Sequence, residues 1–268
     1  MAPDDALLDE LLALALRLAD EAAALLVDGL GRARAEVDTK STVTDMVTEI
    51  DRASEALIVG GLRAARPDDA IVGEEGTADA GTTGVRWLVD PVDGTTNYLY
   101  AHAGFAVSIA AEVDGARAVG VVHDPLHREV FAAAVGRGAT RNSAPIHCSD
   151  KSDMQTALVA TGFAYDPARR AAQAAVLQQV LPRVRDIRRM GAASVDLCSA
   201  ACGRVDAYYE RGLGPWDLGA GALIAAEAGA RVGNLDGGDS IADTILAAPP
   251  ALFDDLAALL RSAGAREA

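Results

Sequence analysis

The sequence has 268 residues, a length that favours one extended domain or two subdomains sharing an interface over two independent domains. The net charge of −15, from 39 acidic and 24 basic residues, argues against nucleic-acid binding, because such a surface repels polyanions. The three cysteines lack close pairing, which argues against a disulfide framework. The acidic amino terminus argues against a signal peptide, and the lack of a long apolar run argues against a membrane span. A cytoplasmic location is therefore expected.

Two helices are predicted at the start of the chain, over 5–28 and 45–65, because leucine and isoleucine recur there at helical spacing. Gly29 and Gly31 predict the end of the first helix, and Pro67 predicts the end of the second. Short strands are predicted at 70–72 and 87–89, and a three-strand meander is predicted from 105 to 135. The first part of the chain, approximately 1–150, therefore combines a helix pair with a mixed sheet.

Strands and helices alternate after about residue 150. The predicted elements are strands at 158–161, 187–190 and 205–210 and helices at 167–181, 193–202, 216–228 and 250–262. Such alternation favours a mostly parallel sheet covered by helices. The arginine-rich segment 183–189 is interpreted as a strand edge rather than a phosphate-binding patch. The fold class is therefore α/β, with one domain over 1–268 whose second subdomain spans approximately 151–268.

Acidic residues follow several predicted strands. Glu74 follows the strand at 70–72, Asp90 and Asp93 follow the strand at 87–89, and Asp217 opens a helix after a Gly-Pro turn. In open α/β sheets ligands bind beyond the carboxyl ends of the strands. Carboxylates gathered there repel one another unless cations lie between them, and all-oxygen ligation suits Mg²⁺. Two such ions, about 3.5–4 Å apart, can bind the attacking and leaving oxygens of a phosphoryl transfer.

Two glycine-containing segments are candidate phosphate sites. The segment 94–97, Gly-Thr-Thr-Asn, combines a glycine that permits a tight turn with residues that cap a helix start. The segment 191–194, Gly-Ala-Ala-Ser, offers a second helix start with little side-chain bulk. A helix amino terminus presents backbone N–H groups and the positive end of the dipole to a phosphate. Together with the carboxylates, these segments indicate a metal-dependent phosphomonoesterase.

The motifs resemble those of the inositol monophosphatase family. Residues 87–98, WLVDPVDGTTNY, are similar to its first signature, and residues 216–221 with 227–229 are similar to its second. Shorter segments at 40–41, 45–51, 73–75 and 208–210 also match, so the resemblance covers nearly the whole chain. It implies an alternating αβαβα sandwich of the inositol monophosphatase and fructose-1,6-bisphosphatase type. It also implies a Mg²⁺-dependent phosphatase that Li⁺ inhibits and that is commonly a homodimer.

The resemblance further implies a set of metal ligands. Glu74, Asp90 and the carbonyl of Val92 would hold one Mg²⁺ ion, and Asp90, Asp93 and Asp217 would hold a second. A third, weaker ion would lie near Glu74 through waters. The nucleophilic water would lie near Glu74 and Thr95. No phosphoenzyme is expected, because a metal that lowers the pKa of water removes the need for a nucleophilic side chain.

The substrate contacts implied by the resemblance complete the expected site. The Thr95 hydroxyl would be held by Asp51, and the backbone N–H groups of Gly94 and Thr95 would hold the phosphate. Lys40 lies on a loop that would close toward the metal site. Asp93, Ala193 and Glu210 would contact the inositol hydroxyls, and Gly191 in the second candidate phosphate segment is expected to bind the substrate as well.

Three functions compete at this point. Hydrolysis of myo-inositol 1-phosphate is favoured, because Glu210 and Thr96-Asn97 point to inositol. Sister enzymes on the same scaffold hydrolyse histidinol phosphate, fructose 1,6-bisphosphate or 3′-phosphoadenosine phosphates, and the fold does not choose among them. The segment 161–165 replaces a serine-rich stretch of some relatives, so Phe163 is expected near the far edge of the substrate. A regulatory protein with a relic site is the third alternative, although every expected metal carboxylate is present.

Overall fold

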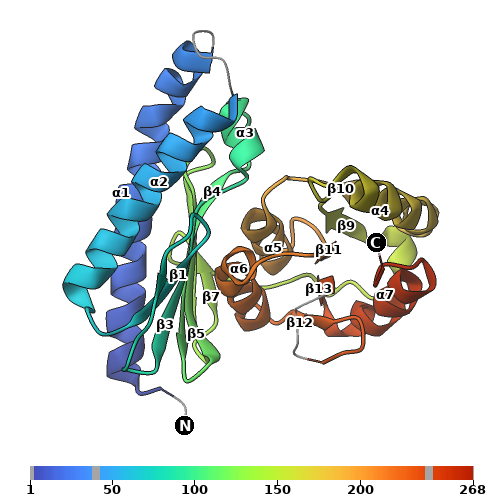
Figure 1. The fold of residues 1–268 in the computed structure, drawn as a ribbon. Helices are drawn as coiled ribbons and strands as arrows, with labels where there is room; N and C mark the ends of the chain where they lie inside the picture. Colours follow the sequence, from blue (N-terminus) through green and yellow to red (C-terminus); the bar gives the residue numbers. More distant parts are fainter. Residues whose placement is uncertain (1–2, 38–42, 239–243, 268) are drawn as a thin grey trace.

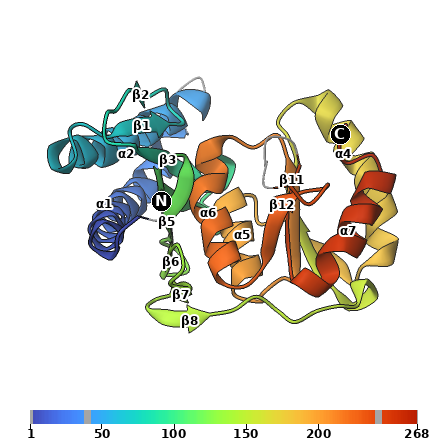
Figure 2. The same cartoon turned by 90° about the horizontal axis from the view of Figure 1, so that it is seen from below.

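The computed structural model describes residues 3–37, 43–238 and 244–267 and shows five alternating layers of helices and strands (Figure 1). The described helices are α1 (Asp5–Val37), α2 (Val43–Ala65), α3 (Thr95–Leu99), α4 (Pro167–Val180), α5 (Ala193–Ala201), α6 (Pro215–Glu227) and α7 (Pro250–Ser262). Helices α1 and α2 form one outer layer, α5 and α6 lie between the two sheets, and α4 and α7 form the other outer layer (Figures 1 and 2). The expected αβαβα sandwich is therefore confirmed. Among the described residues, no helix is long and apolar enough to cross a membrane.

The first sheet is mixed and carries the first signature segment. Its strands are β1 (Ala70–Gly73), β2 (Ala78–Asp79), β3 (Val85–Asp93), β4 (Ala106–Val113), β5 (Ala116–Asp124), β6 (Glu129–Ala134), β7 (Ala139–Arg141) and β8 (Ala144–Ile146). Their spatial order is β2-β1-β3-β4-β5-β6-β7-β8. Strands β1 and β3 are parallel, and every other pair in this sheet is antiparallel. The loops that follow β1 and β3 therefore leave the sheet at the same edge.

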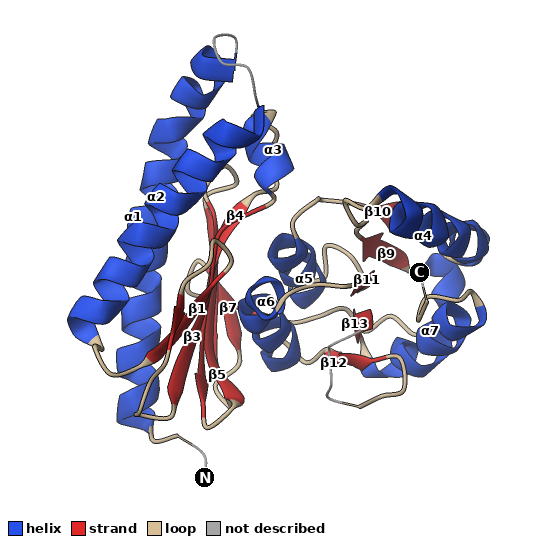
Figure 3. Cartoon of the chain, in the orientation of Figure 1, coloured by secondary structure: helices blue, strands red, loops and turns tan. Residues whose placement is uncertain are grey.

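The second sheet is less parallel than predicted. Its strands are β9 (Leu158–Thr161), β10 (Asp186–Arg188), β11 (Ala207–Arg211), β12 (Arg231–Asn234) and β13 (Thr244–Ala248), in the order β10-β9-β11-β13-β12. Strands β9, β10 and β11 are parallel, whereas β13 and β12 are antiparallel additions. The prediction placed no strand between 228 and 250. Strand β13 lies between β11 and β12 (Figure 3). It is buried along its whole length, so it lacks the alternation that identifies a strand in a sequence.

Helix α1 continues past the glycines that were predicted to end it. It runs to Val37, and Gly29 lies within it rather than at its end. A Cβ atom at Gly29 would lie 2.6 Å from the hydroxyl of Tyr98 and 2.9 Å from the Ile50 side chain. The Tyr98 hydroxyl donates a hydrogen bond to the carbonyl of Leu26. This glycine therefore provides room for the close approach of α2 and α3, and that requirement cannot be seen in a local pattern.

Helix α6 lies very close to the first sheet. A Cβ atom at Gly120 in β5 would lie 2.9 Å from the Cα of Ala220, and one at Gly219 would lie 2.9 Å from Leu88. Small residues on both surfaces let the helix and the sheet approach, so that residues of the first sheet and of α6 share one of the hydrophobic clusters. The first turn of α6, which carries Asp217, is thereby held at the edge where β3 ends.

A buried ionic network fixes the starts of β1 and β3. The Asp69 carboxylate accepts hydrogen bonds from the Arg66 guanidinium (2.7 and 3.1 Å), the Thr83 hydroxyl (2.6 Å) and the Trp87 indole N–H (2.9 Å). These bonds lower the pKa of Asp69, although burial opposes them. The network therefore stabilises β1, which Glu74 directly follows, and β3, which contains Asp90.

Replacing Asp69 with alanine is expected to lower the free energy of unfolding by about 3–5 kcal/mol, because it removes the buried partner of an ion pair together with the acceptor of other buried donors. The Thr83 hydroxyl and the Trp87 N–H would lose their acceptor, and Arg66 would keep only its ion pair with the exposed Glu10. Denaturant unfolding measures the change. Asp68→Ala is the matched control, since it removes the same charge from an exposed neighbouring position. Equal stabilities of the two variants would contradict the assignment.

Candidate active site

The end of β3 turns sharply into α3. The β3–β4 register shifts between Asp90 and Asp93, and the Asp90 carboxylate accepts a hydrogen bond from the Val92 N–H (3.0 Å). Gly94 follows with φ 90°, in the left-handed region, and α3 begins at the next residue. A Cβ atom at Gly94 would lie 2.8 Å from the carbonyl oxygen of Gly104. Glycine is therefore required at this turn by both conformation and space.

Asp93 joins the two subdomains. Its carboxylate accepts hydrogen bonds from the N–H groups of Ala193 (3.2 Å) and Ser194 (2.7 Å) and from the Ser194 hydroxyl (2.5 Å). These donors lie at the start of α5, where a negative charge is favoured by the helix dipole. The N-cap residue itself, Ala192, has no side-chain oxygen. Asp93 therefore supplies from a distant segment the acceptor that a local cap would provide.

Glu74 is positioned by α2. The side chain of Glu55 accepts hydrogen bonds from the N–H of Glu75 (2.9 Å), the N–H of Thr77 (3.2 Å) and the Thr77 hydroxyl (2.6 Å). The Ser54 hydroxyl donates to the carbonyl of Pro91 (3.2 Å). With Asp51, these residues follow an i, i+3, i+4 spacing that places them on one helix face. Sequence reasoning missed Ser54 and Glu55, and this polar spacing is the signal that identifies them.

Three aspartates meet at the edge of the sheet. Ligand oxygens of Asp90, Asp93 and Asp217 lie within 4.8 Å of one another, and Glu74 is close enough to hydrogen-bond Asp90. Burial, followed by repulsion from the neighbouring carboxylates, raises the pKa of Asp217 to about 7 and raises the pKa of Asp90 well above its usual value. Burial also raises the pKa of Glu74 and of Asp93.

This cluster fits a hard cation. Several ionisable oxygens share a small buried volume, where burial and then mutual repulsion raise their pKa values, and a cation bound between them would oppose both effects. Mg²⁺ prefers carboxylates, carbonyls and waters, so these oxygen donors match its chemistry. Asp217 is oriented for this by the Gly214 N–H, which donates to its carboxylate at 2.6 Å.

Asp51 and Thr95 do not bond to each other in this structure. The Thr95 hydroxyl donates to the carbonyl of Val92 (3.1 Å). Asp51 is buried on α2, and none of the described residues donates a hydrogen bond to its Oδ1 atom. Burial, with repulsion from Glu75 and Glu74, raises the pKa of Asp51 to about 8. A buried acceptor without a donor is uncommon, so Asp51 is a candidate to accept a hydrogen bond when the site is occupied.

A cavity of about 370 Å³ collects most of the predicted residues. The predicted residues that line it are Glu74, Asp90, Val92, Asp93, Gly94, Thr95, Gly191, Ala193, Glu210 and Asp217. Asp51 is not part of the lining, and Lys40 lies outside the described residues. The cavity is also lined by residues that sequence reasoning did not assign to the site, namely Tyr165, Arg169, Arg189 and Arg211. The carboxylates and both glycine-containing segments therefore face one space.

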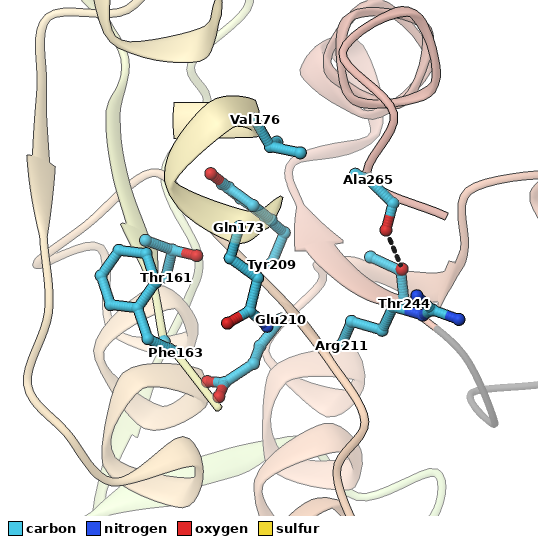
Figure 4. Close-up of a pocket in the computed structure, with 10 residues that line it drawn as sticks. Thr161, Phe163, Gln173, Val176, Tyr209, Glu210, Arg211, Thr244 and Ala265 are labelled. Atoms are coloured by element: carbon cyan, nitrogen blue, oxygen red, sulfur yellow. Dashed lines mark hydrogen bonds between the residues drawn. The ribbon is translucent and has the colours of Figure 1, made fainter. Parts of the chain in front are cut away.

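Glu210 stands on the wall opposite the first sheet. It lies in β11, and its carboxylate accepts a hydrogen bond from the buried Tyr208 hydroxyl (2.7 Å). Burial raises the pKa of Glu210 to about 7. Phe163 lines the same cavity, and a smaller pocket adjoins this wall, with Phe163 and Glu210 on its border (Figure 4). The substrate side of the cavity is thus formed by the second subdomain.

Comparisons with known proteins agree with this geometry. A family model described as the inositol monophosphatase family matches residues 7–265. The chain is 45% identical over 236 residues to an inositol-1-monophosphatase of Mycobacterium leprae, covering 84% of this chain and 81% of that protein. It is 37% identical over 253 residues to a Haemophilus influenzae protein named Nus factor SuhB, covering 93% of this chain and 95% of that protein.

A solved structure leads to the same conclusion. Mycobacterium tuberculosis SuhB matches the model with a TM-score of 0.83 at 41% identity, covering 97% of this chain and 98% of that chain. The similarity therefore extends through both subdomains and includes the helices and strands that bring the carboxylates together. On these grounds the chain belongs to the inositol monophosphatase family, a family of phosphatases.

Proposed function

We propose that the chain hydrolyses myo-inositol 1-phosphate to myo-inositol and phosphate in a Mg²⁺-dependent reaction. The observation that carries the proposal is the carboxylate cluster at one end of the 370 Å³ cavity, where three aspartates offer oxygens within 4.8 Å of one another. The relative of Mycobacterium leprae named inositol-1-monophosphatase supports the choice of substrate. The cavity wall opposite the cluster carries Glu210, the residue expected to select inositol.

The carboxylates have proposed roles as ligands. Glu74, Asp90 and the Val92 carbonyl would hold one ion, and Asp90, Asp93 and Asp217 would hold the second, with a third weaker ion near Glu74. When bound, Mg²⁺ would polarise the phosphate and lower the pKa of a water molecule. These side chains are held in place before any ligand arrives, because Val92 N–H and Gly214 N–H already fix Asp90 and Asp217.

The remaining residues would bind and orient the reactants. The N–H groups of Gly94 and Thr95 would hold the phosphate. The water oxygen would form the new P–O bond while the ester P–O bond breaks, and in the balance one proton of the water would pass to the departing alkoxide, giving free myo-inositol and inorganic phosphate. Asp51, whose Oδ1 atom has no donor among the described residues, would accept the Thr95 hydroxyl once the Val92 carbonyl is a ligand. The Thr95 oxygen would then be free to orient the water.

The sugar side of the substrate would meet the second subdomain. Ala193 and Glu210 would contact hydroxyl groups of the inositol, together with Asp93 and Gly191, and all of these residues line the cavity. Glu210 with a pKa of about 7 would be able to donate or accept a hydrogen bond at neutral pH. Lys40 would act from a loop outside the described residues.

Further properties of the family are part of the proposal. The chain would act as a cytoplasmic homodimer, inhibited by Li⁺, on a small phosphorylated molecule and without a nucleic-acid partner. A regulatory role is the competing function, because the Haemophilus influenzae relative is named a Nus factor. The complete carboxylate cluster favours catalysis over that role.

Phosphate release from myo-inositol 1-phosphate tests the proposal. We expect turnover with Mg²⁺, none in EDTA, and inhibition by Li⁺. Histidinol phosphate, fructose 1,6-bisphosphate and 3′-phosphoadenosine phosphates serve as comparison substrates, ranked by kcat/KM. Absence of phosphate release from every compound in the presence of Mg²⁺ would refute the enzymatic function, and a lower kcat/KM for the inositol phosphate than for the others would refute the choice of substrate.

A further inference from the structure

Two arginines line the active-site cavity on the side of the second subdomain. Arg169 lies in the first turn of α4, and Arg189 directly follows β10. Both line the same 370 Å³ cavity as the carboxylate cluster. The cavity therefore has an acidic end formed by the first sheet and α6, and a wall that carries positive charge.

These two guanidinium groups differ from the arginines that pair with carboxylates. Ion pairs to carboxylates hold many arginines, including Arg188 next to this wall, which pairs with Asp186 at 2.8 Å. Among the described residues, no carboxylate lies within ion-pair distance of the Arg169 or Arg189 guanidinium. Acidic residues outnumber basic ones by 39 to 24, so carboxylate partners are abundant elsewhere. Two arginines that lie in one cavity without a carboxylate partner are suited to bind an anionic ligand.

The acidic groups on this wall are already engaged. The Asp166 carboxylate accepts the backbone N–H of Arg169 (2.8 Å) and thereby caps α4. The Glu210 carboxylate accepts the Tyr208 hydroxyl and is attracted to Arg189 only at longer range. The guanidinium groups therefore keep their N–H donors for a group that enters the cavity.

Glycines make room for both guanidinium groups. A Cβ atom at Gly212 would lie 2.8 Å from the Cζ of Arg169, and one at Gly191 would lie 2.7 Å from Nη1 of Arg189. Both glycines line the cavity and have positive φ, 82° at Gly212 and 91° at Gly191. The two guanidinium groups therefore lie next to these glycines at the cavity surface, where a larger residue would displace them.

We propose that Arg169 and Arg189 bind a second anionic group of the substrate. The guanidinium group suits this task, because its planar set of donors binds phosphate and carboxylate with two parallel hydrogen bonds. The inference rests on the proposed function, since the scissile phosphate is taken to lie at the carboxylate cluster. It extends the substrate class to phosphate monoesters that carry a further phosphate or carboxylate at the far end.

Two matched pairs of compounds test this assignment. Fructose 1,6-bisphosphate is compared with fructose 1-phosphate, and 3-phosphoglycerate with glycerol 3-phosphate, so that each pair differs by one phosphate or one carboxylate. We expect Arg169→Ala and Arg189→Ala to raise KM for the doubly anionic member by about tenfold or more, the loss typical of a charge-assisted hydrogen bond. The KM of the singly anionic member should change by less than about threefold. A larger rise in KM for fructose 1,6-bisphosphate than for 3-phosphoglycerate would indicate that the two arginines bind a phosphate, and the reverse would indicate a carboxylate.

Arg183→Ala is the matched control, because it removes one exposed arginine at the end of the short helix at 181–183, away from the cavity. It should leave both members of each pair unchanged. The proposal would be overturned if the two arginine variants raised KM equally for the singly and doubly anionic members of a pair, or raised it for neither. Thermal shift with fructose 1,6-bisphosphate in EDTA separates this outcome from a failure of the proposed function. If no compound is hydrolysed, a shift that the wild type shows and the two arginine variants lack still supports the second anion site.

Discussion

Asp90→Asn is expected to reduce phosphate release with Mg²⁺ by about a thousandfold or more, while the metal-free protein keeps or gains stability. Asp90 is buried beside Asp93, Glu74 and Asp217, and their mutual repulsion raises its pKa. An amide relieves that repulsion but is a poor substitute for a carboxylate shared by two ions. Loss of metal-ion stabilisation costs several kcal/mol of the barrier, and each 1.4 kcal/mol is about tenfold in rate.

The local structure should survive this change. The amide oxygen of an asparagine can still accept the Val92 N–H, so the turn at the end of β3 keeps its hydrogen bond. Activity is measured as phosphate release, and stability as the midpoint of thermal unfolding in EDTA and in MgCl₂. We expect Mg²⁺ to raise the midpoint of the wild type and to have little effect on the variant. Activity within tenfold of the wild type would contradict the assignment of Asp90.

Asp93→Asn provides the matched comparison. It removes the same charge from the same cluster, but it also weakens the three hydrogen bonds to the start of α5, because the amide N–H₂ group cannot accept from Ser194 or Ala193. We therefore expect a comparable loss of activity together with a lower midpoint in EDTA. A purely regulatory protein would keep its function in both variants, so the same pair of substitutions separates catalysis from the competing role.

The metal-free protein is expected to lose stability as the pH rises from 5.5 to 8.5. The pKa of Asp51 is raised to about 8 and that of Asp217 to about 7, both from 3.8. A carboxyl group with a raised pKa binds more protons in the folded than in the unfolded state. Its contribution is therefore complete below about pH 4 and is lost as the pH passes through 7 to 8. Each kcal/mol lost lowers the midpoint by roughly 2–4 °C in a chain of this size.

Mg²⁺ should reverse this pH dependence, because it binds the ionised carboxylates and stabilises the folded state by mass action. Groups with a lowered pKa, such as Asp69 and Glu129, are ionised throughout this window and do not disturb the comparison. Thermal unfolding in EDTA and in MgCl₂ at both pH values measures the effect. Asp217→Asn should flatten the slope in EDTA, whereas Asp68→Ala should not change it. A midpoint that rises with pH in EDTA would contradict the assignment.

The sequence alone predicted the acidic cluster, because carboxylates at strand ends and glycine turns are local features. Those patterns singled out Glu74, Asp90, Asp93 and Asp217, and all four line one cavity. The long helices and the parallel core of the second sheet were also predictable, since their periodicity extends over many residues. The order of residues in the chain therefore predicted which acidic side chains gather and roughly where they lie.

Contacts between distant segments were decided only in the tertiary structure. Gly29 lies within α1 because Tyr98 and Ile50 approach it, and β13 adds to the second sheet although its buried run has no alternation. The arginine-rich segment does form an edge strand as interpreted, yet Arg189 beyond its end turns into the cavity. A periodic pattern reports which face of an element is buried, but it does not report which other element lies against that face.

The carboxylate cluster shows the same division. The sequence determined that acidic residues lie at the ends of β1 and β3 and in the first turn of α6, because strand ends and helix starts depend on neighbouring residues in the chain. Packing decided that Asp93 also caps α5, and that the buried Oδ1 of Asp51 has no donor among the described residues. Asp93 and the start of α5 are about a hundred residues apart in the chain, and only the close packing of two sheets around α5 and α6 brings them within hydrogen-bond distance.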